Sequence, residues 1–127
     1  EEESRVTDAE AWPTELRLRD EGRLLTVAFD DGRRFDLPAE YLRVTSPSAE
    51  VQGHAPHERK TVPGKKDLAI REIVKTGNYA VRLVFSDGHS TGIYTWVYLA
   101  ELGEQQADRW QAYLAELSAK GLRREKS

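Results

Sequence analysis

Apolar and polar residues alternate along the first part of the chain, from Thr14 onwards. Three segments share this period-two pattern, which is typical of half-buried strands: residues 14–19, 24–29 and 35–37. Asp31-Gly32 separates the second segment from the third and predicts a tight hairpin turn, because glycine tolerates the positive φ of such turns. Pro38 suits the start of a helix, so we expect a short helix over 39–43.

The second half of the chain repeats this plan. Ile70, Glu72 and Val74 mark a strand, residues 79–85 alternate over a second one, and Ile93 closes a third. Thr95 is positioned to cap a helix that runs through Leu102 and is ended by Gly103.

An internal duplication follows from the match between VAFDDGRRFDLPAEYL and LVFSDGHSTGIYTWVYL. Four pairs align directly: Phe29/Phe85, Asp31/Asp87, Gly32/Gly88 and Leu37/Ile93. With one residue inserted, two more pairs align: Tyr41/Tyr98 and Leu42/Leu99. We therefore predict an α+β fold built from two β-hairpin/short-helix repeats in a small antiparallel sheet assembly, related by a two-fold axis or a translation.

The remaining segments lie outside the repeat. Residues 1–13 are acidic and predict a flexible arm, residues 14–121 one domain, and residues 122–127 a basic tail. The last helix, about 104–120, has one apolar stripe, which we expect to pack on the sheet with Trp110 and Leu114 buried.

A long connection of low periodicity, residues 45–67, joins the two repeats. Connections of this length inside a compact domain are usually functional or mobile. We expect residues 52–66 to move on the nanosecond scale and to become ordered on a partner. Candidate contact residues are the histidines and bases of the loop and the nearby hairpin: His54, His57, Arg59, Lys60, Lys65, Lys66 and His89.

Composition narrows the function classes. The chain has no cysteine, which excludes disulfides, thiolate metal sites and cysteine nucleophiles. The net charge of −3 does not favour nucleic-acid binding, and no apolar run reaches the length of a membrane span. The acidic start lacks the features of a signal peptide, so we expect a cytoplasmic protein.

Catalytic signatures are weak. The chain has no G-x-S-x-G motif and no Gly-rich phosphate loop, and Ser46 and Ser48 have no histidine at a spacing that indicates a triad. A metal site that uses His89 with Asp87, His54 or His57 is an open alternative. The H-x-x-H pair lies in a loop interrupted by Pro56, so solvated histidines are the simpler interpretation.

The segments LRVTSPSAEVQGH and VPGKKDLAIREIVKTGNYAVRLVFSDGHSTGIYTWVYL resemble the small bacterial family of gamma-butyrobetaine hydroxylase-like N-terminal domains. The resemblance covers about residues 14–103. In the dioxygenases of that name, a similar domain holds zinc through three cysteines and a histidine. Those positions fall here on Ser46, Ser48, Val51 and His89, and only His89 is retained. The resemblance therefore implies a fold without the family's zinc, and we expect no cofactor.

Similar domains are also joined to Mrp-type P-loop ATPases that carry iron–sulfur clusters. This resemblance implies an accessory role near iron–sulfur or metal-enzyme machinery, with such an ATPase among the candidate partners. Our first hypothesis is a non-catalytic interaction module that binds a protein through residues 45–67 and His89. The alternatives are the metal-binding domain and a subunit that lends a surface to a catalytic partner.

Overall fold

The computed structural model describes residues 12–53 and 55–126. The arm expected over residues 1–13 therefore lies almost wholly outside the described residues, as does His54. The strands are β1 (Pro13–Arg19), β2 (Leu24–Phe29), β3 (Arg34–Pro38), β4 (Ile70–Thr76), β5 (Ala80–Phe85) and β6 (Ile93–Thr95). The α-helices are α1 (Ala39–Val44), α2 (Ala49–Gln52), α3 (Trp96–Glu104) and α4 (Gln106–Ala119), and 3₁₀ turns span Asp20–Gly22 and Pro56–Glu58.

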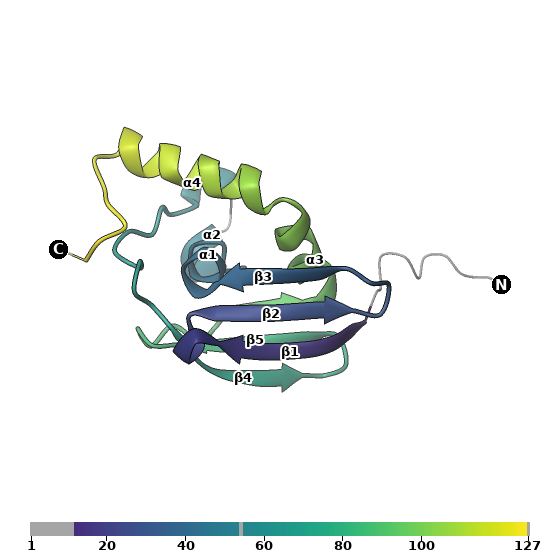
Figure 1. The fold of residues 1–127 in the computed structure, drawn as a ribbon. Coiled ribbons are helices and arrows are strands. Elements are labelled where there is room, and N and C mark those ends of the chain that lie inside the picture. The colour runs from purple at the N-terminus through teal and green to yellow at the C-terminus, as the bar shows by residue number, and fades with distance from the viewer. Residues whose placement is uncertain (1–11, 54, 127) are drawn as a thin grey trace.

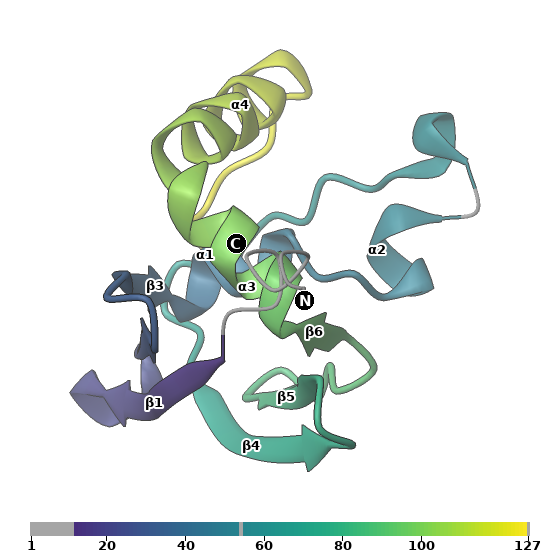
Figure 2. The same cartoon turned by 90° about the vertical axis from the view of Figure 1, so that its right-hand side faces the viewer.

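The strands form two three-stranded antiparallel sheets, in the orders β1-β2-β3 and β4-β5-β6. We call them the first sheet and the second sheet. Figures 1 and 2 show that α1 and α3 lie on the β3 side of the assembly, away from β1 and β4, and that α4 runs across the top. The prediction of an α+β fold with two hairpin–helix repeats is confirmed, and each repeat contains three strands.

The inner faces of the two sheets and the helices between them share one hydrophobic core. Its largest fully buried side chains come from both repeats: Tyr41, Tyr94, Phe85, Leu25, Leu37, Leu42, Leu83, Leu99 and Leu102. Neither sheet of three strands buries its inner face alone. Each repeat therefore depends on the other for its stability.

The backbone hydrogen bonds confirm the two hairpin turns of the alignment. Phe29 N–H donates to the Arg33 carbonyl, and Phe85 N–H donates to that of His89. The pairing of Leu37 with Ile93 is wrong. Leu37 lies opposite Leu25, whereas Tyr94 lies opposite Val81 in the second sheet, so Tyr94 is the equivalent of Leu37. The extra residue of the second repeat lies before β6 and not after it.

The alternation from Ile70 to Val74 is interrupted, contrary to the sequence pattern. A bulge at Arg71 shifts the register between β4 and β5, and a bulge at Thr14 occupies the equivalent place in β1. After the bulge Ile73 packs on the core. Val74 is its neighbour along β4 and points to the outer face of the sheet.

The two repeats are related by an approximate two-fold axis between α1 and α3. Tyr41 Oη donates to the carbonyl of Leu102 at the end of α3 (2.7 Å). Tyr98 Oη donates to the carbonyl of Thr45 at the end of α1 (2.6 Å). Both tyrosines are third after the helix N-cap, and both acceptors occupy the seventh place. Such reciprocal bonds between equivalent residues require a rotation and exclude a simple translation.

Gly103 does not end α3, contrary to the prediction. The helix continues through it to Glu104, and a Cβ at Gly103 would lie 2.3 Å from the Phe35 ring. The glycine is required because β3 approaches the helix closely. The chain instead bends at Gln105, which leads into α4.

The apolar stripe of α4 packs on the domain, but its buried residues differ from those predicted. Tyr113 and Leu117 are buried, together with Val44 of α1. Trp110 and Leu114 are only half-buried. The C-terminal segment is also docked, because Arg123 and Arg124 accept backbone hydrogen bonds from Gly64 and Lys66.

Candidate functional sites

Ser46, His89 and Glu50 form a hydrogen-bonded chain at one end of the second sheet. Ser46 Oγ lies 2.9 Å from Nε2 of His89, and Nδ1 of His89 lies 3.1 Å from Oε1 of Glu50. Ser46 follows α1, Glu50 belongs to α2 and His89 follows the hairpin turn after β5. With the Nδ1 proton directed at Glu50, Nε2 accepts from the serine hydroxyl.

Further hydrogen bonds fix this corner. Ser48 caps α2 by accepting from the Glu50 N–H, and its Oγ lies 2.7 Å from Oγ1 of Thr91. Thr91 Oγ1 also donates to Glu50 (3.2 Å), and Ser48 N–H donates to Ser46 Oγ (3.2 Å). The expectation that Ser46 to Val51 lie beside His89, with serine hydroxyls in hydrogen bonds, is confirmed.

The order of atoms in this corner is that of a Ser–His–carboxylate triad. Sequence spacing gave no sign of it, because the carboxylate comes from α2 and the histidine from a later turn. Ser46, however, is fully buried, and a Cβ at Gly92 would lie 2.4 Å from its Oγ. No substrate carbonyl has access to the hydroxyl in this conformation. Burial, together with the positive charge of Arg43, lowers the pKa of His89 below its usual 6.5, although Glu50 and Asp87 oppose the shift.

The zinc site of the resembling dioxygenases does not fit these residues. Zinc in structural sites takes thiolate sulfur or imidazole nitrogen, usually four ligands. Val51 has no ligand atom and is buried as an apolar side chain. Ser46 and Ser48 are engaged in hydrogen bonds within the protein. Among residues 12–53 and 55–126, no group of three or more metal-ligating side chains is found.

The alternative metal site around Asp87 is not assembled among the described residues. The Asp87 carboxylate binds Arg43 (2.9 Å) and Lys65 (2.7 Å). Burial disfavours the charged form of Asp87, but hydrogen bonds from Lys65, the His89 backbone and Arg43 outweigh it and lower its pKa to about 2. His57 is largely exposed and is near Glu58. His54 lies outside the described residues.

The bases of the central loop mostly have partners within the chain. Arg59 pairs with Glu116 of α4, Lys65 with Asp87, and Lys66 with Glu125. Lys60 has no ion pair in the part of the chain that the structure describes. The loop is thus held against α4 and the C-terminal segment, and its mobility stays a prediction.

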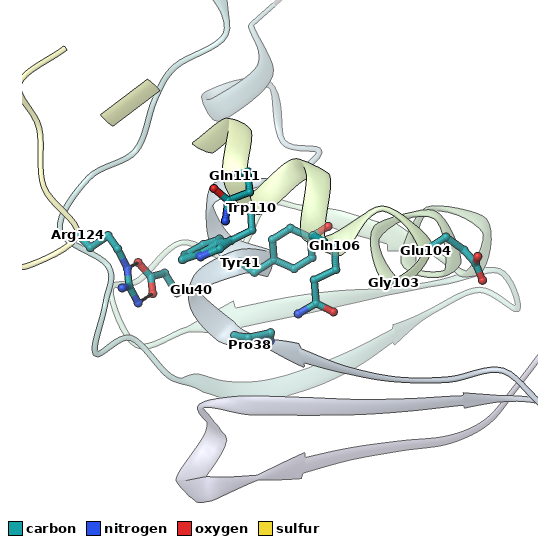
Figure 3. Close-up of a pocket in the computed structure, with 10 residues that line it drawn as sticks. Pro38, Glu40, Tyr41, Gly103, Glu104, Gln106, Trp110, Gln111 and Arg124 are labelled. Carbon is teal, nitrogen blue, oxygen red and sulfur yellow. Dashed lines mark hydrogen bonds and ion pairs between the residues drawn. The ribbon is translucent and has the colours of Figure 1, made fainter. Parts of the chain in front are cut away.

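A cavity of about 770 Å³ lies between α1, the end of α3 and α4 (Figure 3). Tyr41 and Trp110 meet edge to face there, with ring centroids 6.3 Å apart. At one end Arg124 donates two hydrogen bonds to Glu40 (2.8 and 2.9 Å) and covers the Trp110 ring. This ion pair fastens the C-terminal segment to α1 and leaves neither charge available to a ligand.

The outer faces of the two sheets differ sharply although their backbones are equivalent. On the first sheet five of the nine outward residues are charged: Glu15, Arg17, Arg19, Arg34 and Asp36, with Leu24, Thr26, Ala28 and Pro38 between them. Glu15 binds both Arg17 (3.0 Å) and Arg34 (3.1 Å). Asp36 accepts from the buried Thr26 hydroxyl (2.7 Å). Most charges on this face are therefore satisfied within it: Glu15 by two arginines, and Asp36 by a hydroxyl.

On the second sheet the outward residues are mainly uncharged: Val74, Thr76, Ala80, Val84, Ile93 and Thr95, with Glu72, Arg82 and the bulged Arg71 as the charges. We call this surface the apolar face. Three of the four exposed large apolar residues found in the described chain belong to the second sheet, its β4–β5 turn or the first turn of α3: Tyr79 (56%), Ile93 (42%) and Val97 (49%). Sequence reasoning missed this face, because the bulge at Arg71 and the shifted alignment of β6 concealed which residues point outward.

Comparison with known proteins identifies the family. The model of the family described as gamma-butyrobetaine hydroxylase-like, N-terminal, matches residues 16–100. Two proteins with NMR solution structures are 40% and 44% identical, with TM-scores of 0.79 and 0.80. The first comparison covers 92% of each chain, and the second covers 98% of this chain and 92% of the other.

A third similar structure is a crystal structure from Acidithiobacillus ferrooxidans, described as a protein of unknown function in the DUF971 family. It is 41% identical, with a TM-score of 0.60, and covers 72% of this chain and 91% of that chain. No curated protein sequence matches. The chain belongs to the gamma-butyrobetaine hydroxylase-like, N-terminal family, as its sequence motifs predicted. No helix within the described residues is long and apolar enough to cross a membrane.

Proposed function

We propose that this member of the family is a non-catalytic interaction module, and that it binds a protein partner through the apolar face. One observation carries the proposal. Two equivalent sheets present the same backbone to solvent, but among the described residues only the first carries ion pairs on its outer face. Exposed apolar residues that gather on one surface commonly mark an interaction site.

The apolar face is a different surface from the one that sequence reasoning selected. The loop bases are engaged with α4, Asp87 and the C-terminal segment, except Lys60. His89 is buried and bonded at both ring nitrogens. A partner that contacts the second sheet therefore needs no rearrangement of the loop.

The non-catalytic part of the proposal rests on the burial of Ser46. A reactive serine must reach its substrate, and here the hydroxyl packs against Gly92. We expect no labelling of the folded chain by a fluorophosphonate probe. Covalent modification of Ser46 that disappears in the Ser46→Ala variant would contradict the proposal and assign a hydrolytic role to the Ser46–His89–Glu50 chain.

The partner is proposed to belong to iron–sulfur or metal-enzyme machinery, with an Mrp-type P-loop ATPase as the first candidate. This part is supported by the family resemblance alone. It is tested by mixing the purified chain with such an ATPase from the same organism and measuring association by calorimetry. Absence of binding to the ATPase removes that candidate.

The docking surface is tested by comparing three forms of the chain in affinity capture from the native host. The Val74→Asp/Ile93→Asp variant should lose the proteins retained by the parent, because two charges now occupy the apolar contact. The control, Arg17→Ser/Arg34→Ser, changes the outer face of the first sheet and should retain them. Equal retention by all three forms would show that the partner binds elsewhere.

A further inference from the structure

We propose that the partner segment on the apolar face presents a carboxylate, bound by Arg82, between apolar side chains. This inference rests on the proposed function and adds the chemistry of the partner. The occupant is therefore an acidic amphipathic segment of another protein.

Arg82 occupies the centre of the apolar face. It lies on β5 directly between Val74 of β4 and Ile93 of β6, and these three outward side chains form one row across the sheet. The side chain is half-buried, so its methylene groups are part of the apolar surface.

The Arg82 guanidinium retains most of its hydrogen-bonding capacity. One amino group donates to the carbonyl of Ser90 (3.1 Å). Arginine has five N–H donors, and no carboxylate of the described residues pairs with this one. A carboxylate matches the remaining N–H groups of the planar guanidinium, because its two oxygens can accept two parallel hydrogen bonds. Such charge-assisted bonds are shorter and stronger than neutral ones.

The first sheet shows what is missing. There Glu15 of β1 lies between Arg17 and Arg34 and binds both. The equivalent of Glu15 in the second sheet is Glu72, which lies opposite Val84 and has no ion pair among the described residues. The chain supplies its own carboxylate to the arginines of the first sheet, whereas on the second sheet Arg82 is left without one.

The surrounding charge favours an acidic partner over a second copy of this chain. Around the outer face of the second sheet the strands contribute two bases and one acid: the exposed Arg71 at the bulge, Arg82 and Glu72. Lys75 lies on the inner side of β4, as Ile73 does. None of these bases has an ion pair within residues 12–53 and 55–126. Two such faces would bring the same excess of positive charge together, whereas an acidic segment is attracted to it.

Two synthetic peptides of equal length test the inference. Both have Leu and Val at alternate positions, with Glu at the intervening positions of one and Lys at those of the other. They are titrated into the full chain by NMR. We expect the Glu peptide to shift the amide signals of Val74, Arg82 and Ile93 and to bind more weakly as salt rises. Arg82→Glu should weaken it about tenfold or more and favour the Lys peptide. Arg34→Glu on the first sheet is the matched control and should change neither titration.

Each other outcome overturns the inference. If both peptides bind the face equally, before and after Arg82→Glu, the partner charge is wrong, while the apolar docking surface of the proposed function remains. If neither peptide shifts these signals, an acidic segment is not the occupant. If the parent chain forms dimers that Ile93→Asp abolishes, the occupant is a second copy.

Discussion

Two equivalent corners of the molecule show how one backbone can support two chemistries. In the first repeat Phe35 packs over Gly103, and Arg33 lies 5.4 Å above the Phe29 ring. In the second repeat the same places are taken by Gly92, Ser46, His89 and Phe85. The glycine lies in the last turn of α3 in the first case and directly before β6 in the second, where a hydroxyl–imidazole pair replaces the aromatic ring. We call the first the aromatic corner and the second the polar corner.

The first corner stabilises the fold by apolar packing, whereas the second holds polar side chains that need hydrogen-bond partners. An aromatic ring over glycine contributes buried apolar area and needs no polar partner. A buried imidazole requires a partner at each ring nitrogen, and Ser46 and Glu50 provide them. The second corner holds polar groups that bind one another, while the first corner only closes the core.

The largest effect is expected at the aromatic corner. Gly103→Val should destabilise the fold by about 3 kcal/mol, because its Cβ would lie 2.3 Å from the Phe35 ring. Unfolding in denaturant measures the change. Adding Phe35→Ala to Gly103→Val should recover part of the loss, since the ring is the obstacle. Additive effects of the two substitutions would show that the contact is not the cause.

Removal of the hydroxyl at the polar corner should have a smaller effect. Ser46→Ala leaves Nε2 of His89 without its partner and should lower the free energy of unfolding by about 1–2 kcal/mol. Ser48→Ala is a control that keeps the bond to His89 and removes the cap of α2. A Ser46→Ala variant as stable as the parent would mean that water replaces the hydroxyl at no net loss.

The two-fold relation predicts similar losses at its two tyrosines. Tyr41→Phe and Tyr98→Phe each remove one hydrogen bond to a helix-end carbonyl and should each cost about 1 kcal/mol. Thermal unfolding compares them directly. A large loss at one tyrosine and none at the other would break the equivalence of the repeats.

The smallest expected effect is a pH dependence that belongs to the polar corner alone. The folded-state pKa of His89 is lowered, so the unfolded chain binds its proton first as pH falls. Stability should therefore decrease as the pH falls below about 6.5. His89→Gln should flatten this slope, whatever its effect on stability at neutral pH. An unchanged slope would assign the titration to another group.

The sequence contains enough information for the repeats but not for their exact register. Alternation and the two Asp-Gly turns predict the hairpins correctly, because these signals are local. The bulge at Arg71 and the extra residue before β6 have no local signal, and each one reverses which side chains face outward. For this reason the sequence pattern does not identify Val74 and Ile93 as neighbours on the outer face.

The candidate sites were also predictable only in part. The family motif places Ser46 beside His89, but the third member, Glu50, depends on where α2 is held. Glycine often ends helices, so the sequence predicts a helix end at Gly103, whereas here the residue accommodates the Phe35 ring from a distant strand. Close contacts between segments far apart in the sequence belong to the tertiary structure, and local sequence patterns do not predict them.

Because of the reciprocal tyrosine hydrogen bonds, the two repeats of this single chain are arranged like the two subunits of a closed homodimer. Each repeat donates a hydroxyl to the helix end of the other, so neither half satisfies its own carbonyl. A chain cut in the connection between α2 and β4 should therefore remain associated, and the separate halves should be unstable until they meet. In that case each half would fold only as it binds the other half.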